Sequence, residues 1–205
     1  MLDKTKSLII VISAPSGAGK TTLTKRLLQI SSFAYSVSFT TRPPRKNEIE
    51  GVDYYFISNE EFQKMVEEGK FVEWARVHGQ LYGTSIDLLD NAIETKKDVV
   101  LEVDVKGGIE IKEKYPKAVL IFLLPPSWQE LEKRLNKRNT EVEERITERI
   151  KQAKKEIAYA PSYDYLVVND DINKALSDIL SIVKAERCRL DRLSLENLSK
   201  NKRSD

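Results

Sequence analysis

The residues with the clearest chemical potential lie in segment 13–22, which reads SAPSGAGKTT. The segment follows an apolar run at residues 8–12 and precedes residues 23–28, whose spacing predicts a helix. A glycine-rich turn between a buried strand and a helix start leaves several backbone N–H groups unpaired. These groups point to one spot, where the helix dipole also favours negative charge. The segment therefore predicts a cradle for phosphate groups.

Within this cradle, Lys20 is expected to reach the β- and γ-phosphates of a nucleoside triphosphate, and the Thr21 hydroxyl to complete the coordination of Mg²⁺. Ala14 stands where the G-x-x-x-x-G-K-[ST] pattern has its first glycine, so the turn must begin in a conformation that tolerates a Cβ. An ordinary turn is the alternative, but it has no need of Lys followed by Thr. The residues expected around the triphosphate are Ser16, Gly17, Ala18, Gly19, Lys20, Thr21 and Thr22.

Arginine side chains gather in two further places. Arg42 and Arg45 belong to a loop that prolines stiffen, and three more arginines flank a break between two predicted helices: Arg134, Arg138 and Arg149. Phosphoryl transfer depends mainly on positioning and charge neutralisation. Separate cations beside a triphosphate site therefore indicate transfer to a second phosphate-bearing molecule, which needs no general base because it is already ionised. Taken alone, each cluster is also compatible with a solvated basic surface.

The surrounding pattern predicts an α/β fold with a central parallel sheet flanked by helices. Residues 98–104 form an apolar run that ends in carboxylates, as expected at the carboxyl edge of a parallel strand. Residues 35–41 alternate like a strand, and residues 165–168 read as the last strand. Short, aromatic-rich elements predict an inserted small mixed α+β lobe, in which Phe56, Phe62, Phe71 and Trp74 are expected in the core. We expect one domain with a core at 1–32, 94–131 and 158–190, the lobe at 33–93, a helical lid at 132–157 and a polar tail at 191–205.

Composition excludes several functions. The chain has 205 residues, of which 40% are hydrophobic and 32% charged, and no apolar run is long enough to cross a bilayer. A net charge of +2 is too balanced for binding nucleic acid by bulk charge. One cysteine and one histidine offer neither a disulfide nor a zinc site. The polar start of the chain, with no apolar signal region, indicates a cytoplasmic protein.

Several sequence blocks occur in the order seen in guanylate kinases, and the chain resembles this family from residue 8 to about residue 185. The blocks are SAPSGAGKTTL, SVSFTTRPPR, GVDYYF, FVEWARVHGQLYGTS, LEVDVKG, FLLPPS, KRNTE and YDYLVVNDD. The resemblance implies a P-loop nucleoside monophosphate kinase that uses ATP and Mg²⁺ to phosphorylate GMP to GDP, in purine metabolism and GMP recycling. It leaves open whether dGMP is used and whether the protein is a monomer or a small homo-oligomer.

The resemblance also implies roles for individual residues. Lys20, Arg42, Arg134, Arg138 and Arg149 match catalytic positions, and Asn169 matches a position near the adenine of ATP. The positions that match the family's GMP site are Ser38, Arg42, Arg45, Tyr54, Glu73, Tyr82, Thr84, Glu102 and Asp104. A carboxylate at Glu73 suits guanine, whose N1–H and N2–H₂ donors lie side by side, and repels the N1 lone pair of adenine. Two positions depart from the family pattern: Lys137 replaces a glycine, and Glu102 a common aspartate.

Two other functions remain as alternatives. Guanylate-kinase-like domains of scaffold proteins bind phosphopeptides without catalysis, but typically have a degraded cradle, whereas Gly19, Lys20 and Thr21 are intact here. The second alternative is a kinase for a different nucleotide on the same architecture. Glu73 and Ser38 distinguish it, because both are expected to contact the base.

Overall fold

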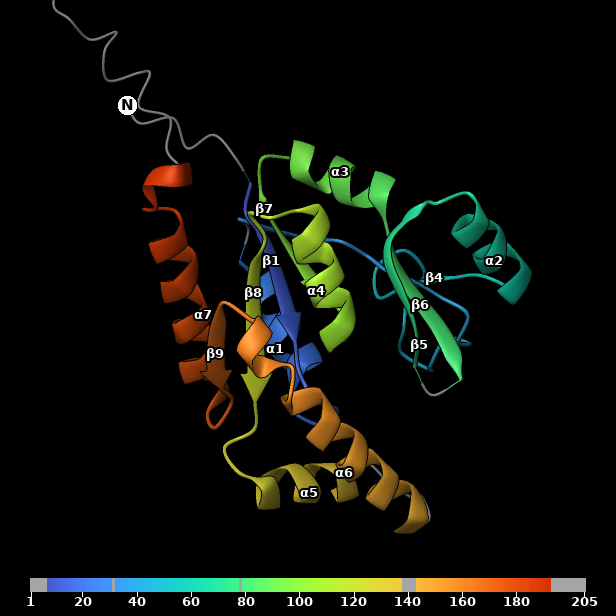
Figure 1. The fold of residues 1–205 in the computed structure, drawn as a ribbon, viewed down its shortest axis with the longest axis vertical. Coiled ribbons are helices and arrows are strands. Elements are labelled where there is room, and N and C mark those ends of the chain that lie inside the picture. Colours follow the sequence, from blue (N-terminus) through green and yellow to red (C-terminus); the bar gives the residue numbers. More distant parts are fainter. Residues whose placement is uncertain (1–6, 31, 78, 138–142, 193–205) are drawn as a thin grey trace, which may run out of the picture.

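A computed structural model describes residues 7–30, 32–77, 79–137 and 143–192 (Figure 1). Five strands form a parallel sheet in the order β2-β7-β1-β8-β9. They are β1 (Ile9–Ser13), β2 (Phe33–Tyr35), β7 (Asp98–Glu102), β8 (Val119–Leu124) and β9 (Tyr165–Val168). This arrangement confirms the predicted α/β fold with a central parallel sheet.

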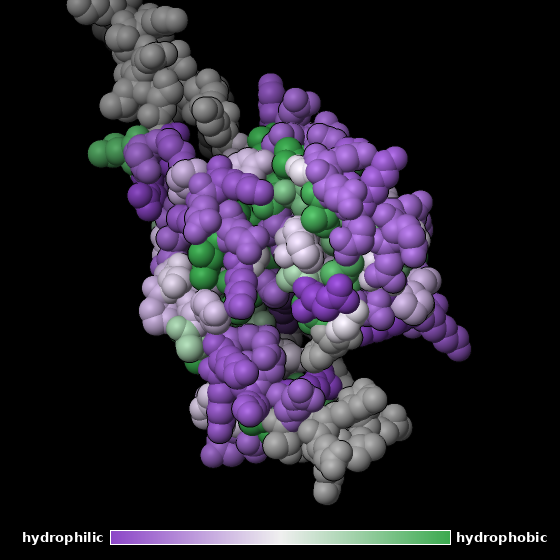
Figure 2. Space-filling view, turned by 45° about the vertical axis from the view of Figure 1, so that its right-hand side comes forward, coloured by the Kyte–Doolittle hydropathy of each residue, from purple (hydrophilic) through white to green (hydrophobic). Residues whose placement is uncertain are grey.

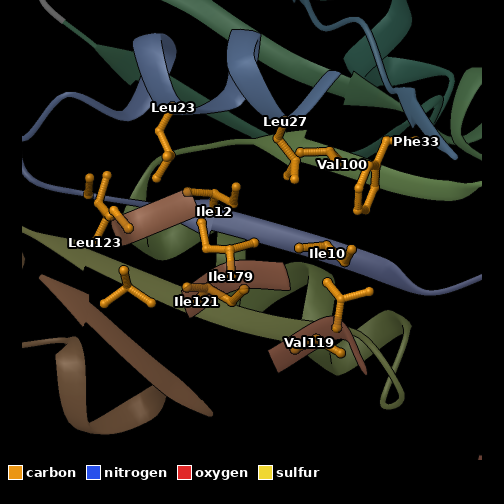
Figure 3. Packing of buried hydrophobic residues seen from close by; sticks show 14 of the residues in the cluster. Ile10, Ile12, Leu23, Leu27, Phe33, Val100, Val119, Ile121, Leu123 and Ile179 are labelled. Carbon is orange, nitrogen blue, oxygen red and sulfur yellow. The ribbon is translucent and has the colours of Figure 1, made fainter. Parts of the chain in front are cut away.

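Both faces of the central sheet are covered, which explains why its strands are apolar throughout. Ile10 and Ile12 of β1 pack with α1 (Lys20–Leu28) and α7 (Ile172–Glu186) on one face (Figure 3). Val11 faces the other side, among residues of α3 (Ile86–Glu94) and α4 (Val105–Lys114). The side chains of Ile10, Val11 and Ile12 all have 0% exposure, so the strand that leads into the cradle is packed on both faces.

A second, smaller sheet forms a lobe beside the first (Figure 1). Its strand order is β4-β3-β6-β5, with β3 (Phe39–Thr40), β4 (Tyr55–Phe56), β5 (Phe71–Val77) and β6 (Gln80–Ser85). The pairing is mixed, because β3 and β4 are parallel while the other pairs are antiparallel. Helix α2 (Asn59–Glu67) covers this sheet and stacks Phe62 on Phe71 at 4.5 Å between ring centroids. The lobe therefore has its own small apolar core.

Three expectations about this region need correction. The alternating segment 35–41 is not one strand: β2 ends in the central sheet, and β3 belongs to the lobe. Along residues 36–40, buried positions alternate with partly exposed ones, so the sequence period continues across the change of sheet. Residues 33–35 form β2 of the central sheet, and α3 buries Leu89 in a cluster with residues of the central sheet, so the predicted lobe 33–93 includes residues that pack with the core. Trp74 is 43% exposed instead of buried, although its ring contacts Phe62 edge-on.

Two helices extend from the carboxyl edge of the central sheet (Figure 1). Helix α5 (Trp128–Lys137) begins where the Ser127 Oγ accepts the Glu130 N–H at 3.1 Å, the predicted N-terminal cap. Helix α6 (Glu143–Ile157) packs Ala153 against Leu131 and Leu135 of α5. Two 3-10 turns follow, at Ala160–Ser162 and Leu190–Arg192.

The visible molecular surface is mostly hydrophilic (Figure 2). Among the helices that the structure describes, none combines the length and the apolar character required to span a bilayer.

Candidate active site

The predicted phosphate cradle lies between β1 and α1. Gly17 and Gly19 have φ angles of 89° and 91°, in the left-handed region that favours glycine. A Cβ on Gly19 would lie 2.4 Å from Asn169 Nδ2, so no other residue fits there without displacing Asn169. Ala14 is 8% exposed and does not adopt a positive φ, so its methyl group fits the start of the turn, as expected. The loop therefore keeps a glycine only where the backbone requires one.

A backbone carbonyl and a carboxylate at the carboxyl end of β7 hold the two cradle residues with the clearest chemical roles. The Lys20 ammonium donates to the Val103 carbonyl at 2.8 Å, and the Thr21 hydroxyl donates to Glu102 Oε1 at 2.6 Å. Because β7 is adjacent to β1 in the sheet, residues more than 80 positions apart meet at one edge. The predicted strand is present at Asp98–Glu102, and it brings Glu102 to the carboxyl edge of the sheet, as expected, where it meets Thr21 of the cradle.

The donor atoms at this edge suit Mg²⁺. Thr21 gives its proton to Glu102, so the lone pairs of its hydroxyl oxygen remain available, and both side chains offer oxygen, the ligand type Mg²⁺ prefers. No group of three or more acidic, histidine or cysteine side chains in the described parts of the chain could hold a metal by itself. Thr21 and Glu102 would therefore hold the ion together with phosphate oxygens.

A second anion site centres on Arg42 in the lobe. The Arg42 Nη2 donates to both carboxylate oxygens of Glu48, at 2.8 and 2.9 Å, and Nε donates to the Tyr82 hydroxyl at 3.2 Å. The guanidinium lies 5.4 Å from the centre of the Tyr54 ring. Since Tyr82 accepts from Arg42, its own O–H is left to donate to a bound anion. Arg42, Tyr54 and Tyr82 are thus brought together as expected, whereas the Arg45 side chain is exposed.

Glu48 is a site residue that the sequence did not reveal. Besides Arg42, its carboxylate accepts the Arg45 N–H at 2.8 Å. Burial alone would raise the pKa of Glu48, but the hydrogen bonds from the Arg45 backbone and from Arg42 outweigh burial and lower it. Glu48 therefore remains ionised and fixes the orientation of the arginine. The only signal was an acid three residues after Arg45 in a basic loop.

Glu73 lies where the lobe meets the core. It is 5% exposed, and its Oε1 accepts the Thr84 hydroxyl at 2.6 Å. A Cβ on Gly107 of α4 would lie 2.5 Å from Glu73 Oε2, so only a glycine lets the carboxylate approach this closely. Asp104 begins α4 by accepting the Gly107 N–H at 2.7 Å. Burial, reinforced by the charge of Asp104, raises the pKa of Glu73 to about 7 although the Thr84 hydrogen bond opposes this shift. Ser38, a further residue expected at the base, is also buried.

The two helices after β8 contact the cradle directly. Arg149 Nη2 of α6 donates to the Ser16 hydroxyl at 3.0 Å, and Arg134 Nη2 of α5 donates to the Asn169 carbonyl at 3.2 Å. Asn169 in turn donates from Nδ2 to the Ala18 carbonyl at 2.8 Å. Arg149 and Asn169 therefore bond the loop directly, and Arg134 is linked to it through Asn169. Thr22 is exposed, and Arg138 lies outside the described residues.

Glu156 of α6 is a second contact that the sequence did not reveal. Its Oε2 accepts the Ser16 N–H of the cradle at 3.3 Å. Burial raises the pKa of Glu156, despite hydrogen bonds from Gln152 and Ser16. The residue sits in a run of charged side chains, where nothing in the sequence distinguishes it from a solvated acid.

Fold and site together define a class of protein. Thr21 of the cradle donates to Glu102, and burial together with the charge of Glu102 raises the pKa of Tyr54 in the Arg42 site to about 12, so the two anion sites lie near each other. This arrangement suits a P-loop kinase whose donor and acceptor both carry phosphate. The family model described as guanylate kinase matches residues 6–186. The chain belongs to the guanylate kinase family.

Individual relatives agree with this membership. The chain is 48% identical over 188 residues to a guanylate kinase of Clostridium tetani, covering 92% of this chain and 90% of that protein. It is 50% identical over 193 residues to a guanylate kinase of Myxococcus xanthus, covering 93% and 92%. The crystal structure of guanylate kinase from Anaplasma phagocytophilum superposes with a TM-score of 0.80 at 33% identity, covering 96% of this chain and 95% of that one.

Proposed function

We propose that this protein transfers the γ-phosphoryl group of ATP to GMP, forming ADP and GDP, in purine nucleotide metabolism. Membership of the guanylate kinase family supports this activity. The observation that carries it is the position of Glu73: a buried carboxylate, held by Thr84, at the junction that the cradle also faces. A cytoplasmic location is part of the proposal, since the cellular pools of ATP and GMP are found there.

The cradle and the lobe take different parts of the reaction. The amides of residues 16–21 and the Lys20 ammonium would hold the triphosphate, and Arg42 and Tyr82 the phosphate of GMP. An oxygen of the GMP phosphate then bonds to the γ-phosphorus, while the bond from that phosphorus to the bridging oxygen breaks and ADP leaves. Mg²⁺, which Thr21 and Glu102 would hold together with phosphate oxygens, would supply charge neutralisation. Arg134 and Arg149 lie on α5 and α6, which would act as a lid, so that the two arginines would stabilise the transferring group and exclude water.

The base specificity follows from the chemistry of Glu73. An ionised carboxylate accepts both N1–H and N2–H₂ of guanine, and the Ser38 hydroxyl can donate to O6. Adenine offers a lone pair at N1 and no O6, so it would leave these buried groups unpaired. Such mismatches allow strong discrimination between bases. We further propose that the acceptor lobe comprises residues 36–85, the segment between β2 and α3.

A panel of monophosphates tests the proposal. With MgATP as donor, GMP should give GDP and ADP in equal amounts, and AMP and UMP should be poor acceptors. Product formation is followed by a coupled spectrophotometric assay and checked by chromatography. Equal turnover of AMP would exclude the guanine assignment while leaving a kinase, whereas failure to bind MgATP would favour a non-catalytic binding module.

The raised pKa of Glu73 predicts that GMP binding releases protons. Because the pKa of Glu73 in the free protein is about 7, roughly half of the molecules carry this proton at pH 7, and guanine selects the ionised form. Calorimetric titration with GMP at pH 7, in two buffers of different ionisation enthalpy, should show release of about half a proton, falling toward zero by pH 8.5. Titration with MgATP serves as the control and should show no such step near pH 7. GMP binding without proton release at pH 7 would contradict the assigned contact.

A further inference from the structure

Lys25, one helical turn after Thr21, forms an ion pair between the core and the lobe. Lys25 lies four residues after Thr21 on α1, so both side chains project from the same face of the helix. The Lys25 ammonium lies 2.8 Å from Asp53 Oδ1. Asp53 belongs to the loop before β4 of the lobe, and its Oδ2 accepts the Ile49 N–H at 3.0 Å. One carboxylate therefore fixes its own loop and binds the helix that carries the phosphate cradle.

This ion pair lies at the opposite edge of the lobe from a second polar contact with the core. In the lobe sheet, β5 and β4 are the two outer strands. On the β5 edge, the Lys114 ammonium of α4 donates to the carbonyls of Phe71 and Val72. On the β4 edge, Lys25 reaches Asp53. The chain itself connects lobe and core only at residues 36–38 and 85–86, so the ion pair restrains the β4 edge, which is farthest in the sheet from the Lys114 contact.

The restrained edge carries the acceptor site. Tyr54 follows Asp53 directly, and its ring lies beside Arg42 at 5.4 Å and edge-on to Tyr82 at 5.9 Å. The Asp53 side chain is 15% exposed, whereas that of Lys25 is 62% exposed. The hydrogen bond from Lys25 lowers the pKa of Asp53, so the carboxylate is charged at neutral pH. A shift of this loop relative to α1 would therefore move the acceptor phosphate relative to the cradle.

We propose that the Lys25–Asp53 ion pair positions the acceptor lobe against the phosphate cradle, setting the distance between the two bound nucleotides. Both are positioning residues rather than catalytic ones. This inference rests on the proposed function, because it concerns the alignment of donor and acceptor in that reaction. An exposed ion pair contributes little to folding stability, whereas a small misplacement of reacting groups can cost much more in rate.

A double-mutant cycle tests this role. Lys25→Met, Asp53→Asn and the double variant are compared with the wild-type protein in steady-state kinetics, with GMP varied at saturating MgATP and low ionic strength. We expect kcat/KM for GMP to fall about fivefold to tenfold in each single variant, with no further loss in the double variant. Lys25→Arg should restore most of the lost activity. The difference from wild type should shrink at about 0.5 M salt, where the ion pair is screened.

Arg26 provides the matched control. It neighbours Lys25 on α1 but donates to Asn173 Oδ1 at 2.7 Å, within the core. Arg26→Met should leave kcat/KM for GMP unchanged, and the midpoint of thermal unfolding of Lys25→Met should stay near that of wild type. Single-variant losses that multiply in the double variant, or single variants as active as wild type, would overturn the inference. If the wild-type protein itself makes no GDP from GMP and ATP, it is the proposed function that fails.

Discussion

Replacing Lys20 by methionine should lower kcat for GDP formation by about a hundred- to a thousandfold, because the reaction loses a preorganised cation at the phosphates. The ammonium is already fixed in the free protein by the Val103 carbonyl at 2.8 Å, so it needs little reorganisation to meet developing charge. Methionine keeps an unbranched chain of similar length without the charge. The coupled assay at saturating substrates measures the loss, and KM for GMP should change much less than kcat.

Two comparisons separate this effect from damage to the fold. Lys184→Met removes an exposed cation from α7, far along the chain from the cradle, and should retain wild-type kcat. Calorimetry should show GMP binding to Lys20→Met with an affinity close to that of wild type, because the lobe is unchanged. A Lys20→Met protein with more than a tenth of wild-type kcat would contradict the role assigned to the lysine.

The cradle could be predicted from sequence because its conformation depends on residues that are close together in the chain. Glycine at 17 and 19, lysine at 20 and a preceding apolar strand specify the turn without reference to distant residues, and both glycines adopt positive φ angles in the structure. The last strand, β9, spans the predicted residues 165–168 for the same reason: a short apolar run ends at polar residues. The buried position of Glu73 was identified through family resemblance and not through periodicity.

The contacts between core and lobe could not be predicted, because they depend on tertiary placement. Glu48, Glu156 and the Lys25–Asp53 pair are charged residues among many others, and only folding selects the partners of each. The division of segment 35–41 between two sheets was missed for a related reason. Alternation of apolar and polar residues indicates a half-buried strand, but it does not indicate which sheet the strand joins.

Replacing Glu73 by glutamine should lower kcat/KM for GMP by about a hundred- to a thousandfold while leaving MgATP affinity within about twofold of wild type. Glutamine preserves the size of the side chain and one acceptor oxygen, but it places an NH₂ donor where guanine also offers a donor. The site is buried and held by Thr84, so the amide has little freedom to turn away or recruit water. Steady-state kinetics with varied GMP and calorimetry with MgATP measure the two quantities separately.

Glu60→Gln gives the matched control, because it makes the same change of charge on an exposed residue of the same lobe. It should keep wild-type kcat/KM for GMP. The Glu73 variant should also lose the proton release on GMP binding near pH 7, measured at GMP concentrations high enough to saturate it, because the group whose pKa is about 7 is gone. A parallel fall in MgATP affinity would show that Glu73 supports the junction of core and lobe as a whole. Loss confined to GMP, together with loss of the proton step, is the result expected if the carboxylate itself meets the base.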